Sequence, residues 1–537
     1  MKVLSAAQMR EVDRLTTERY GIPGLQLMED AAVNVTEAVE KRYGSAKGKG
    51  ILVIAGRGNN GGDGAAVARR FHLKGATVVL IVLGRIDDSR GDARSNFELA
   101  HRMSQGQPDT FRVIEVDTPE QLRDAGESFR FEWVVDAIFG TGLTRPAGGI
   151  YEIAIDYINE HRRPGVPVIS VDIPSGISSD SAELIGPAVK ADLTVTFTAP
   201  KAASILPAAC HYGGELVVAA IGSPAALIAE VGARLNLIES SDIAQWLSKS
   251  RRGPDANKGD VGKVLIVAGS RGKTGAACLA GAGALRSGTG LVTVATAESS
   301  LPVVAAHLLI EGMTEPLKET ETGTISDEAT NRILQLAGER DVLAIGPGIG
   351  SADESTQTMV RSVVTSRRQP IVIDADGLNS LAPWVEGLKG SAELPVIITP
   401  HPGEMARLLG RPTSYVVRNR ADVARDFAVR NCVIVILKGS RTVIACPDGE
   451  VYVNPTGNSG MATGGTGDVL TGIAAGLLAQ KLDDPIGAAI AAVYLHGLAG
   501  DLAAAQRGAR ALIASDIVEH LGDAFLRTGG EAERLIQ

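Results

Sequence analysis

The sequence predicts an α/β protein of two three-layer αβα domains, each with a sheet between two layers of helices. Its 537 residues suit roughly two to four domains of ordinary size. Short runs rich in β-branched residues alternate with helical stretches, a rhythm typical of parallel sheets. Glycine is abundant at 63 residues, whereas aromatic residues make up only 4%. This balance favours tight turns and Gly-rich ligand loops over large aromatic cores.

The chain opens with a predicted helix. Ser5 and Gln8 have the spacing of a capping box, and Met9, Val12 and Leu15 follow on one helical face. An apolar face of this kind needs a surface to cover it. We therefore expect the helix to dock on a domain.

The predicted strands form two series, separated by a turn-rich stretch. Gly222-Ser223-Pro224 and the polar, partly basic segment 248–258 lie between the series and suit a solvated linker. We place the domain boundary near residue 230, give or take about ten residues, with domains 1–225 and 226–537. The first strand series is 51–55, 77–83, 133–137, 167–172 and 193–197, and the second is 263–268, 291–295, 342–346, 370–374, 395–399 and 432–437.

Composition disfavours several classes of protein. With 45% hydrophobic and 21% charged residues, the chain has the balance of a globular protein. The formal charge of -9 leaves no basic surplus for a nucleic-acid backbone. The four cysteines are far apart, which disfavours a thiolate metal site. We expect no membrane partner and a cytoplasmic protein that binds small molecules; apolar helices of low charge density permit a homo-oligomer.

The first strand runs into a Gly-rich loop. The segment 56–64 reads Gly-Arg-Gly-Asn-Asn-Gly-Gly-Asp-Gly and precedes a predicted helix, so it has the G-x-G-x-x-G pattern in its proper context. Such a loop lets backbone N–H groups approach a phosphate. The acidic residue expected after the second strand is absent, because Leu83-Gly84-Arg85 stands there. This argues against an ordinary hydride-transfer domain, and a simple tight turn remains an alternative.

Oxygen-bearing side chains follow two further strands of the first series. Asp136 precedes the segment 140–146, and Asp172 and Ser175 follow the next strand. The carboxyl ends of parallel strands share one edge, so these groups can converge beside the Gly-rich loop. Hard oxygen donors suit an alkali or alkaline-earth cation. Taken singly, Asp136 or Asp172 would more readily be a helix cap.

Together with Gly21-Ile22-Pro23 and Leu27-Met28-Glu29, these motifs resemble the NAD(P)H-hydrate epimerase family over roughly residues 1–222. The resemblance implies a Rossmann-like epimerase domain, with Asp172 as the acid/base group and a potassium ion held by Asn60, Asp136 and Ser175. Lys201 is a weaker acid/base candidate, with an exposed surface lysine as the alternative. The residues implied to hold the hydrated dinucleotide are Asn59, Asn60, Gly61, Gly62, Asp63, Gly140, Thr141, Gly142, Leu143, Thr144, Arg145 and Pro146.

In the second half, a carboxylate stands behind glycines at a predicted helix entrance. Gly464-Gly465-Thr466-Gly467 precedes Asp468 and an apolar helix. Backbone N–H groups there can neutralise phosphoryl charge while Asp468 takes a proton from an attacking hydroxyl. A plain helix cap would not require these glycines. By contrast, Gly272-Lys273-Thr274 lacks the spacing of a phosphate-binding P-loop, so we expect it to shape a substrate pocket instead.

Three more segments that follow strands favour a nucleotide site: 346–350, 399–404 and 437–442. Lys438 can grip phosphates or be an exposed turn lysine. His401, between two prolines, is rigidly presented and favours a ligand contact. Asp374 and Asp376 suit either a place near magnesium or helix capping.

These motifs resemble the ribokinase-like superfamily, in its ADP/ATP-dependent NAD(P)H-hydrate dehydratase branch, over roughly residues 240–525. The resemblance implies ADP and Mg²⁺ as cofactors, with Asp468 as the catalytic base. Ser459 stands where the family commonly has proline, which puts the rigidity of that turn in doubt. The contacts implied are Ala276, Gly350, His401 and Asp468 to the hydrated dinucleotide, and Lys438, Gly439, Ser440, Arg441, Thr442 and Gly467 to ADP.

The two resemblances together imply repair of hydrated NAD(P)H. The first domain would interconvert the R and S hydrates, and the second would dehydrate the S hydrate with ADP. The sequence alone leaves ADP against ATP open, and the resemblance to fused bacterial enzymes leans to ADP. One alternative is a small-molecule kinase with Asp468 in the same role. Another makes the first half a nucleotide sensor without turnover.

Overall fold

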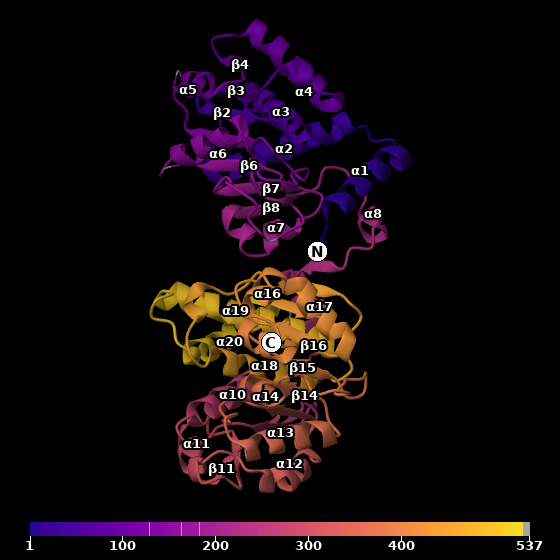
Figure 1. The fold of residues 1–537 in the computed structure, drawn as a ribbon, viewed down its shortest axis with the longest axis vertical. Coiled ribbons are helices and arrows are strands. Elements are labelled where there is room, and N and C mark those ends of the chain that lie inside the picture. Colours follow the sequence, from indigo (N-terminus) through magenta and orange to yellow (C-terminus); the bar gives the residue numbers. More distant parts are fainter. Residues whose placement is uncertain (128, 163, 182, 530–537) are drawn as a thin grey trace. The chain divides into compact units, whose positions relative to one another are not determined.

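The structure is a computed structural model and describes residues 1–127, 129–162, 164–181 and 183–529. The chain divides into two compact units, Met1–Leu235 and Asn236–Gln537 (Figure 1). Helix α8 (Ala225–Glu230), which follows the predicted boundary at residue 225, packs on the first unit through the buried Leu227. Residues 530–537 of the predicted second domain lie outside the described residues.

The first unit contains a seven-stranded sheet in which all neighbouring strands are parallel. The five predicted strands are present, which confirms the α/β class. Two strands at the sheet edges were not predicted, because their polar, partly exposed residues interrupt the apolar pattern. In spatial order the strands are β4 (Phe111–Val116), β3 (Thr77–Leu83), β2 (Gly50–Ala55), β5 (Trp133–Ala137), β6 (Val168–Val171), β7 (Leu193–Phe197) and β8 (Glu215–Ala219).

Helices cover both faces of this sheet, because the central strands are apolar on both sides. Ile51 and Val53 of β2 pack with the helices α2, α3 and α4, whereas Leu52 and Ile54 pack with α5 and α6. The predicted capping box of Ser5 and Gln8 is confirmed at the start of α1. The short strand β1 (Lys2–Val3) precedes the helices α1 (Ala6–Tyr20), α2 (Gly24–Tyr43), α3 (Asn59–Leu73), α4 (Gly91–Gly106), α5 (Pro119–Glu127), α6 (Ile150–His161) and α7 (Ala202–Ile205).

The second unit contains a larger sheet that is not wholly parallel. Strands from β12 to β16 pair in parallel, but β16, β17 and β18 pair antiparallel. The second series of predicted strands does not include this hairpin of three-residue strands, which is too short to give a clear pattern. The spatial order is β9 (Leu235–Leu237), β18 (Val451–Val453), β17 (Val443–Ala445), β16 (Ile434–Leu437), β15 (Val396–Ile398), β14 (Ile371–Ile373), β13 (Val342–Ile345), β10 (Lys263–Val267), β11 (Leu291–Ala297) and β12 (Met313–Leu317).

Helices again cover both faces of the sheet. Ile266 of β10 and Val294 of β11 pack with α9, α10, α18, α19 and α20, while α12 and α17 contact the sheet from outside this core. Part of the predicted linker is helical, since α9 extends to Lys249. The helices are α9 (Ser240–Lys249), α10 (Thr274–Arg286), α11 (Leu301–His307), α12 (Thr330–Ala337), α13 (Glu354–Ser366), α14 (Ala375–Ser380), α15 (Pro402–Leu409), α16 (Thr413–Arg418), α17 (Arg420–Asn431), α18 (Thr466–Gln480), α19 (Pro485–Arg507) and α20 (Ala514–Gly529).

Helix α19 is long and apolar enough to cross a membrane by length and composition alone. In its most apolar 18-residue window, however, 67% is buried inside the protein. It contacts α18 and α20 and contributes Ala492 and Leu495 to the core. Burial of this kind is the property of a core helix.

Candidate active sites

The predicted Gly-rich loop in the first unit connects β2 to α3. Helix α3 begins at Asn59, with Gly58 as its N-cap. A methyl group added at Gly61 would lie 1.7 Å from the carbonyl oxygen of Gly56, and one at Gly62 would lie 2.7 Å from Cα of Ala93. Larger side chains are therefore excluded from the turn, and the helix start stays close to the sheet edge.

Asn60 is the least satisfied polar side chain of this loop. It is 8% exposed, and neither its Oδ1 nor its Nδ2 has a hydrogen-bond partner among the described residues. A methyl group added at Gly140 would lie 3.3 Å from Cγ of Asn60 and 3.3 Å from Oδ2 of Asp172. The ends of β2, β5 and β6 thus bring together three residues that the sequence analysis singled out. A buried amide without a partner indicates space for a ligand or ion.

Asp136, near the carboxyl end of β5, is fully buried. Ser175 Oγ donates to its Oδ1 at 2.5 Å, while Ser170 Oγ and the Ser175 backbone N–H donate to its Oδ2 at 2.8 Å each. Burial raises the pKa of Asp136 although these donors oppose the shift. The structure therefore brings two of the three predicted potassium ligands, Asp136 and Ser175, into direct contact.

Asp172 forms a buried ion pair with Lys201. Lys201 Nζ lies 2.6 Å from Asp172 Oδ1, and the Lys201 side chain is 1% exposed. Thr196 Oγ1 donates to the same carboxylate oxygen at 3.0 Å. Asp172 has a φ of 66°, which is uncommon for a residue other than glycine. Lys201 is thus no surface lysine: the fold places it at the predicted acid/base group.

The rest of the predicted dinucleotide segment follows β5 and precedes α6 without regular structure. Thr141 is half-buried and its carbonyl accepts from Ser179 Oγ at 3.3 Å. Leu143 is buried. The remaining residues are exposed and free of helix or strand constraints: Gly142, Thr144, Arg145 and Pro146.

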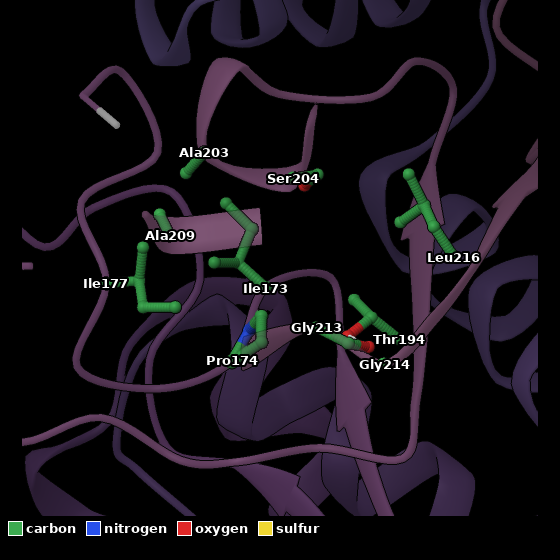
Figure 2. Close-up of a pocket in the computed structure, with 10 residues that line it drawn as sticks. All are labelled: Ile173, Pro174, Ile177, Thr194, Ala203, Ser204, Ala209, Gly213, Gly214 and Leu216. Atoms are coloured by element: carbon green, nitrogen blue, oxygen red, sulfur yellow. Dashed lines mark hydrogen bonds between the residues drawn. The ribbon is translucent and has the colours of Figure 1, made fainter. Parts of the chain in front are cut away.

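The first unit also contains a small pocket (Figure 2). Ile173 and Pro174, which follow Asp172, form part of its lining, as do Thr194 of β7 and Leu216 of β8. None of the lining residues has an ionisable side chain. Neither Asp172 nor Lys201 lines this pocket.

In the second unit, Asp468 occupies the third position of α18, as the sequence analysis predicts. Gly465 is the N-cap with a φ of 93°, which suits glycine. Burial raises the pKa of Asp468 to about 6, with Asp374 adding to the rise and Lys438 opposing it. His496 supports the loop from behind, since its Nε2 lies 2.9 Å from the Thr466 carbonyl oxygen; burial lowers its pKa to about 4. His496 has no signal in the sequence, because it lies on a distant apolar helix.

Lys438, which is half-buried, forms an ion pair with the buried Asp374. Lys438 Nζ lies 2.6 Å from Asp374 Oδ1, and Thr471 Oγ1 donates to Asp374 Oδ2 at 2.7 Å. A methyl group added at Gly467 would lie 3.2 Å from Lys438 Nζ. Burial disfavours the charge on Lys438, but Asp374 and Glu404 outweigh it and raise its pKa. Lys438 is therefore a fixed cation beside Asp468 rather than an exposed turn lysine.

Asp376 is also paired with a lysine. Lys273 Nζ lies 3.1 Å from its Oδ2, and the Gly350 N–H donates to the same oxygen at 2.9 Å. These donors outweigh burial and lower its pKa. A methyl group at Gly348 would lie 2.9 Å from Cβ of Ala276. The Gly-rich turn 346–350 thus adjoins the start of α10, and Lys273, which the sequence analysis set aside, reaches the site. Neither Asp374 nor Asp376 makes a side-chain cap hydrogen bond at α14.

The remaining predicted site residues of the second unit are His401 and the loop 439–442. His401 is exposed and caps α15 through Nδ1, which accepts from the Gly403 N–H at 2.9 Å. Burial lowers its pKa. Arg420 donates to the Ser440 carbonyl oxygen at 2.6 Å and to the Leu437 carbonyl oxygen at 3.1 Å. The loop is therefore held by its carbonyl groups; Gly439 and Ser440 are exposed, while Arg441 and Thr442 are half-buried.

The fold and these sites define an α/β protein with a Rossmann-like first unit and a ribokinase-like second unit. Residues 24–203 match the family model described as YjeF-related protein N-terminus, and residues 264–522 match the model described as NAD(P)H-hydrate dehydratase. The chain belongs to the family of bifunctional NAD(P)H-hydrate repair enzymes, whose members combine an epimerase half with a nucleotide-dependent dehydratase half. This confirms the class of function that the motifs predict.

Curated relatives are similar to this protein over the whole chain. The bifunctional NAD(P)H-hydrate repair enzyme Nnr of Moorella thermoacetica is 41% identical over 538 residues, covering 100% of this chain and 99% of the relative. That of Thermofilum pendens is 37% identical and covers 100% of this chain and 98% of the relative. A solved structure, the ADP/ATP-dependent NAD(P)H-hydrate dehydratase of Bacillus subtilis with ATP and Mg²⁺, is 33% identical, with a TM-score of 0.47, 55% of this chain covered and 98% of that chain.

Proposed function

We propose that the chain restores hydrated NAD(P)H in two steps, each carried by one buried aspartate. The first unit interconverts the R and S hydrates at Asp172, and the second dehydrates the S hydrate at Asp468. The observation that carries the proposal is the position of Asp468 on the Gly-capped start of α18, beside the Lys438–Asp374 pair. The substrate is a dinucleotide, and ADP is the proposed phosphoryl donor.

For the dehydratase, Asp468 takes the proton from the ring hydroxyl while that oxygen attacks the terminal phosphoryl group of the nucleotide. Phosphate then leaves as the ring nitrogen supplies an electron pair that forms a carbon–nitrogen double bond. Loss of a proton from the neighbouring ring carbon returns the electron pair to nitrogen and restores the dihydronicotinamide. Hydroxide is a poor leaving group and phosphate a good one, so phosphorylation lowers the barrier to elimination. The N–H groups at the start of α18 and the Lys438 ammonium are placed to stabilise the phosphoryl charge.

The nucleotide is proposed to lie along Lys438 and the loop 439–442 with Gly467, and the hydrated dinucleotide against Ala276, Gly350 and His401. Mg²⁺ would neutralise phosphate charge when bound. Among the described residues, no group of three His, Cys, Asp or Glu side chains could hold a metal ion. Asp374 and Asp376 are engaged by lysines. We therefore propose that the phosphate oxygens supply most Mg²⁺ ligands.

For the epimerase, Asp172 is proposed to exchange a proton with the hydroxyl as its bond to the ring breaks and reforms. Lys201 and Thr196 hold one carboxylate oxygen, so the other is available toward Gly140. The segments 59–63 and 140–146 would bind the dinucleotide. The unpartnered Asn60 amide and the buried Asp136 and Ser175 fit the oxygen-donor set of a potassium ion, which would supply positive charge near the phosphates.

The deciding experiment incubates the purified full chain with mixed epimers of hydrated NADH and follows the near-ultraviolet absorbance of NADH. With ADP, recovery of the whole pool is expected; parallel reactions with ATP test the donor preference. Recovery of only the S half would remove the epimerase assignment. A stable phosphorylated product would instead indicate a kinase.

The pH dependence of dehydration is expected to report Asp468. A base must be ionised, and burial raises the pKa of Asp468 to about 6. As the pH falls through about 6, kcat/KM for the S hydrate should therefore drop about tenfold per pH unit. Initial rates of NADH formation measure the profile. His401→Gln serves as the control. The fall in kcat/KM should occur at the same pH in this variant; if the fall disappears, the titrating group is His401 rather than Asp468.

Potassium is expected to stabilise the first unit through Asn60. In the parent chain, thermal melting of this unit should shift upward as KCl replaces choline chloride at constant ionic strength, because a ligand of the folded state stabilises it. Asn60→Ala should abolish the shift. Asn34→Ala, on the half-buried face of α2, is the matched control and should keep it. An equal shift in both variants would contradict a site at Asn60.

A further inference from the structure

Helix α1 is fixed against the segment that carries Lys201. The Leu4 N–H donates to the Pro200 carbonyl oxygen at 3.0 Å, and the Ala6 N–H donates to Asp180 Oδ1 at 2.7 Å. Val12 of α1 packs in one core cluster with Ala199. The helix therefore holds its next residue, Asp13, in a defined place beside the epimerase site.

One carboxylate oxygen of Asp13 lacks a hydrogen-bond partner among the described residues. This oxygen, Oδ1, is buried. Burial raises the pKa of Asp13 to about 6; the charge of Lys201 opposes this rise and that of Asp172 adds to it. Asp13 thus lies within electrostatic reach of the ion pair at the proposed reaction centre.

Lys201 cannot satisfy Asp13, because its three N–H bonds are already used. Its Nζ donates to Asp172 Oδ1 at 2.6 Å, to Thr196 Oγ1 at 2.8 Å and to the Phe197 carbonyl oxygen at 3.1 Å. The site therefore contains two unlike carboxyl groups. Asp172 is tied to a cation, whereas the buried oxygen of Asp13 is open to a proton or a ligand.

Asp63 of α3 is the other carboxyl group that faces this cluster. Burial, together with the charges of Asp172 and Asp13, raises its pKa well above the usual value. A group that holds its proton so tightly exchanges it poorly at neutral pH. Full ionisation would also leave three carboxylates around the single ammonium of Lys201, which burial disfavours. Asp13 is therefore the better partner for Asp172.

We propose that Asp13 is a second acid/base residue of the epimerase site, acting on the substrate hydroxyl opposite Asp172; this rests on the proposed epimerase function. Asp13 gives its proton to the hydroxyl, the carbon–oxygen bond breaks, and the ring nitrogen supplies the electron pair that forms a carbon–nitrogen double bond. The released water then attacks the other face, the electron pair returns to nitrogen, and Asp172 takes the water's proton. The reverse reaction moves the proton back from Asp172 to Asp13.

The test compares Asp13→Asn with the parent full chain on the purified R hydrate, following its conversion to the S hydrate by chromatography without nucleotide. Epimerisation should fall by roughly 10²–10⁴ in kcat. In the parent, kcat/KM should fall as the pH rises above about 6, because Asp13 must carry a proton; the variant should lack this limb. Glu18→Gln, at an exposed residue of α1, should match the parent in rate and profile.

A second variant separates chemistry from folding. Asp13→Ala leaves room for a small acid, so added formate should restore part of its epimerisation rate, which a merely structural role would not allow. Dehydration of the S hydrate should be unchanged in both variants. Parent-like epimerisation by Asp13→Asn, or an unchanged pH limb with no formate rescue, would overturn the proposal. If the parent itself does not epimerise, the proposed function of the first unit fails instead.

Discussion

Asp468→Asn is expected to abolish most dehydration while leaving epimerisation intact. Asparagine keeps the shape of the side chain but cannot accept a proton from the ring hydroxyl. The loss of a positioned general base costs roughly 10²–10⁴ in rate, so kcat for the S hydrate should fall by about that factor. The measurement is NADH formation from the S hydrate with saturating ADP.

Two comparisons sharpen this result. Asp483→Asn, at an exposed residue after α18, should dehydrate like the parent. The residual activity of Asp468→Asn should also no longer fall as the pH drops below about 6. Parent-like repair by Asp468→Asn would remove the central role of this carboxylate, and with it the mechanism proposed for the second unit.

Asp172→Asn is expected to leave a repair enzyme that uses only one epimer. Without the carboxylate tied to Lys201, conversion of the R hydrate should fall by roughly 10²–10⁴. With an epimer mixture and ADP, the S hydrate should be consumed at the parent rate. NADH formation should then slow to the spontaneous rate of epimer exchange, which a time course of absorbance would detect.

The variant also leaves a buried ammonium without its counter-charge, and removing one partner of a buried pair costs about 3–5 kcal/mol. The double variant Asp172→Asn with Lys201→Met removes both charges and separates the two effects. It should melt closer to the parent yet remain inactive as an epimerase. Asp156→Asn, at an exposed residue of α6, is the control and should retain both activities. Epimerisation by the double variant would exclude Asp172 as the acid/base group.

The local signals predict the fold well where they are strong. The central strands of both units are mostly apolar, and each was located to within two residues at either end. The edge strands β4, β8 and β12 were missed, because their residues are polar or include proline. The hairpin β17–β18 was missed because three-residue strands give no period.

Some site residues could likewise be recognised from the sequence, whereas the partners of others could not. Asp136, Asp172 and Asp468 are recognisable because each stands where a strand or Gly-rich turn ends. Lys201 was underestimated, since sequence does not reveal that its side chain is buried against Asp172. The roles open for Asp374 were a place near magnesium or helix capping, but the structure gives it Lys438 and Thr471 as partners. Its partners lie 64 and 97 positions away in the chain.

The amino-acid sequence by itself determined the α/β class, the two units and the Gly-rich turns, because strand runs and glycine positions act locally on the backbone. Only the tertiary structure decided which charges meet. Docking of α1 brings Asp13 toward Lys201, 188 positions further along the chain, and burial then gives these groups proton affinities that no sequence spacing encodes. Charge pairing depends on distance in space and on exclusion of water, and both arise only when the helices close over the sheet.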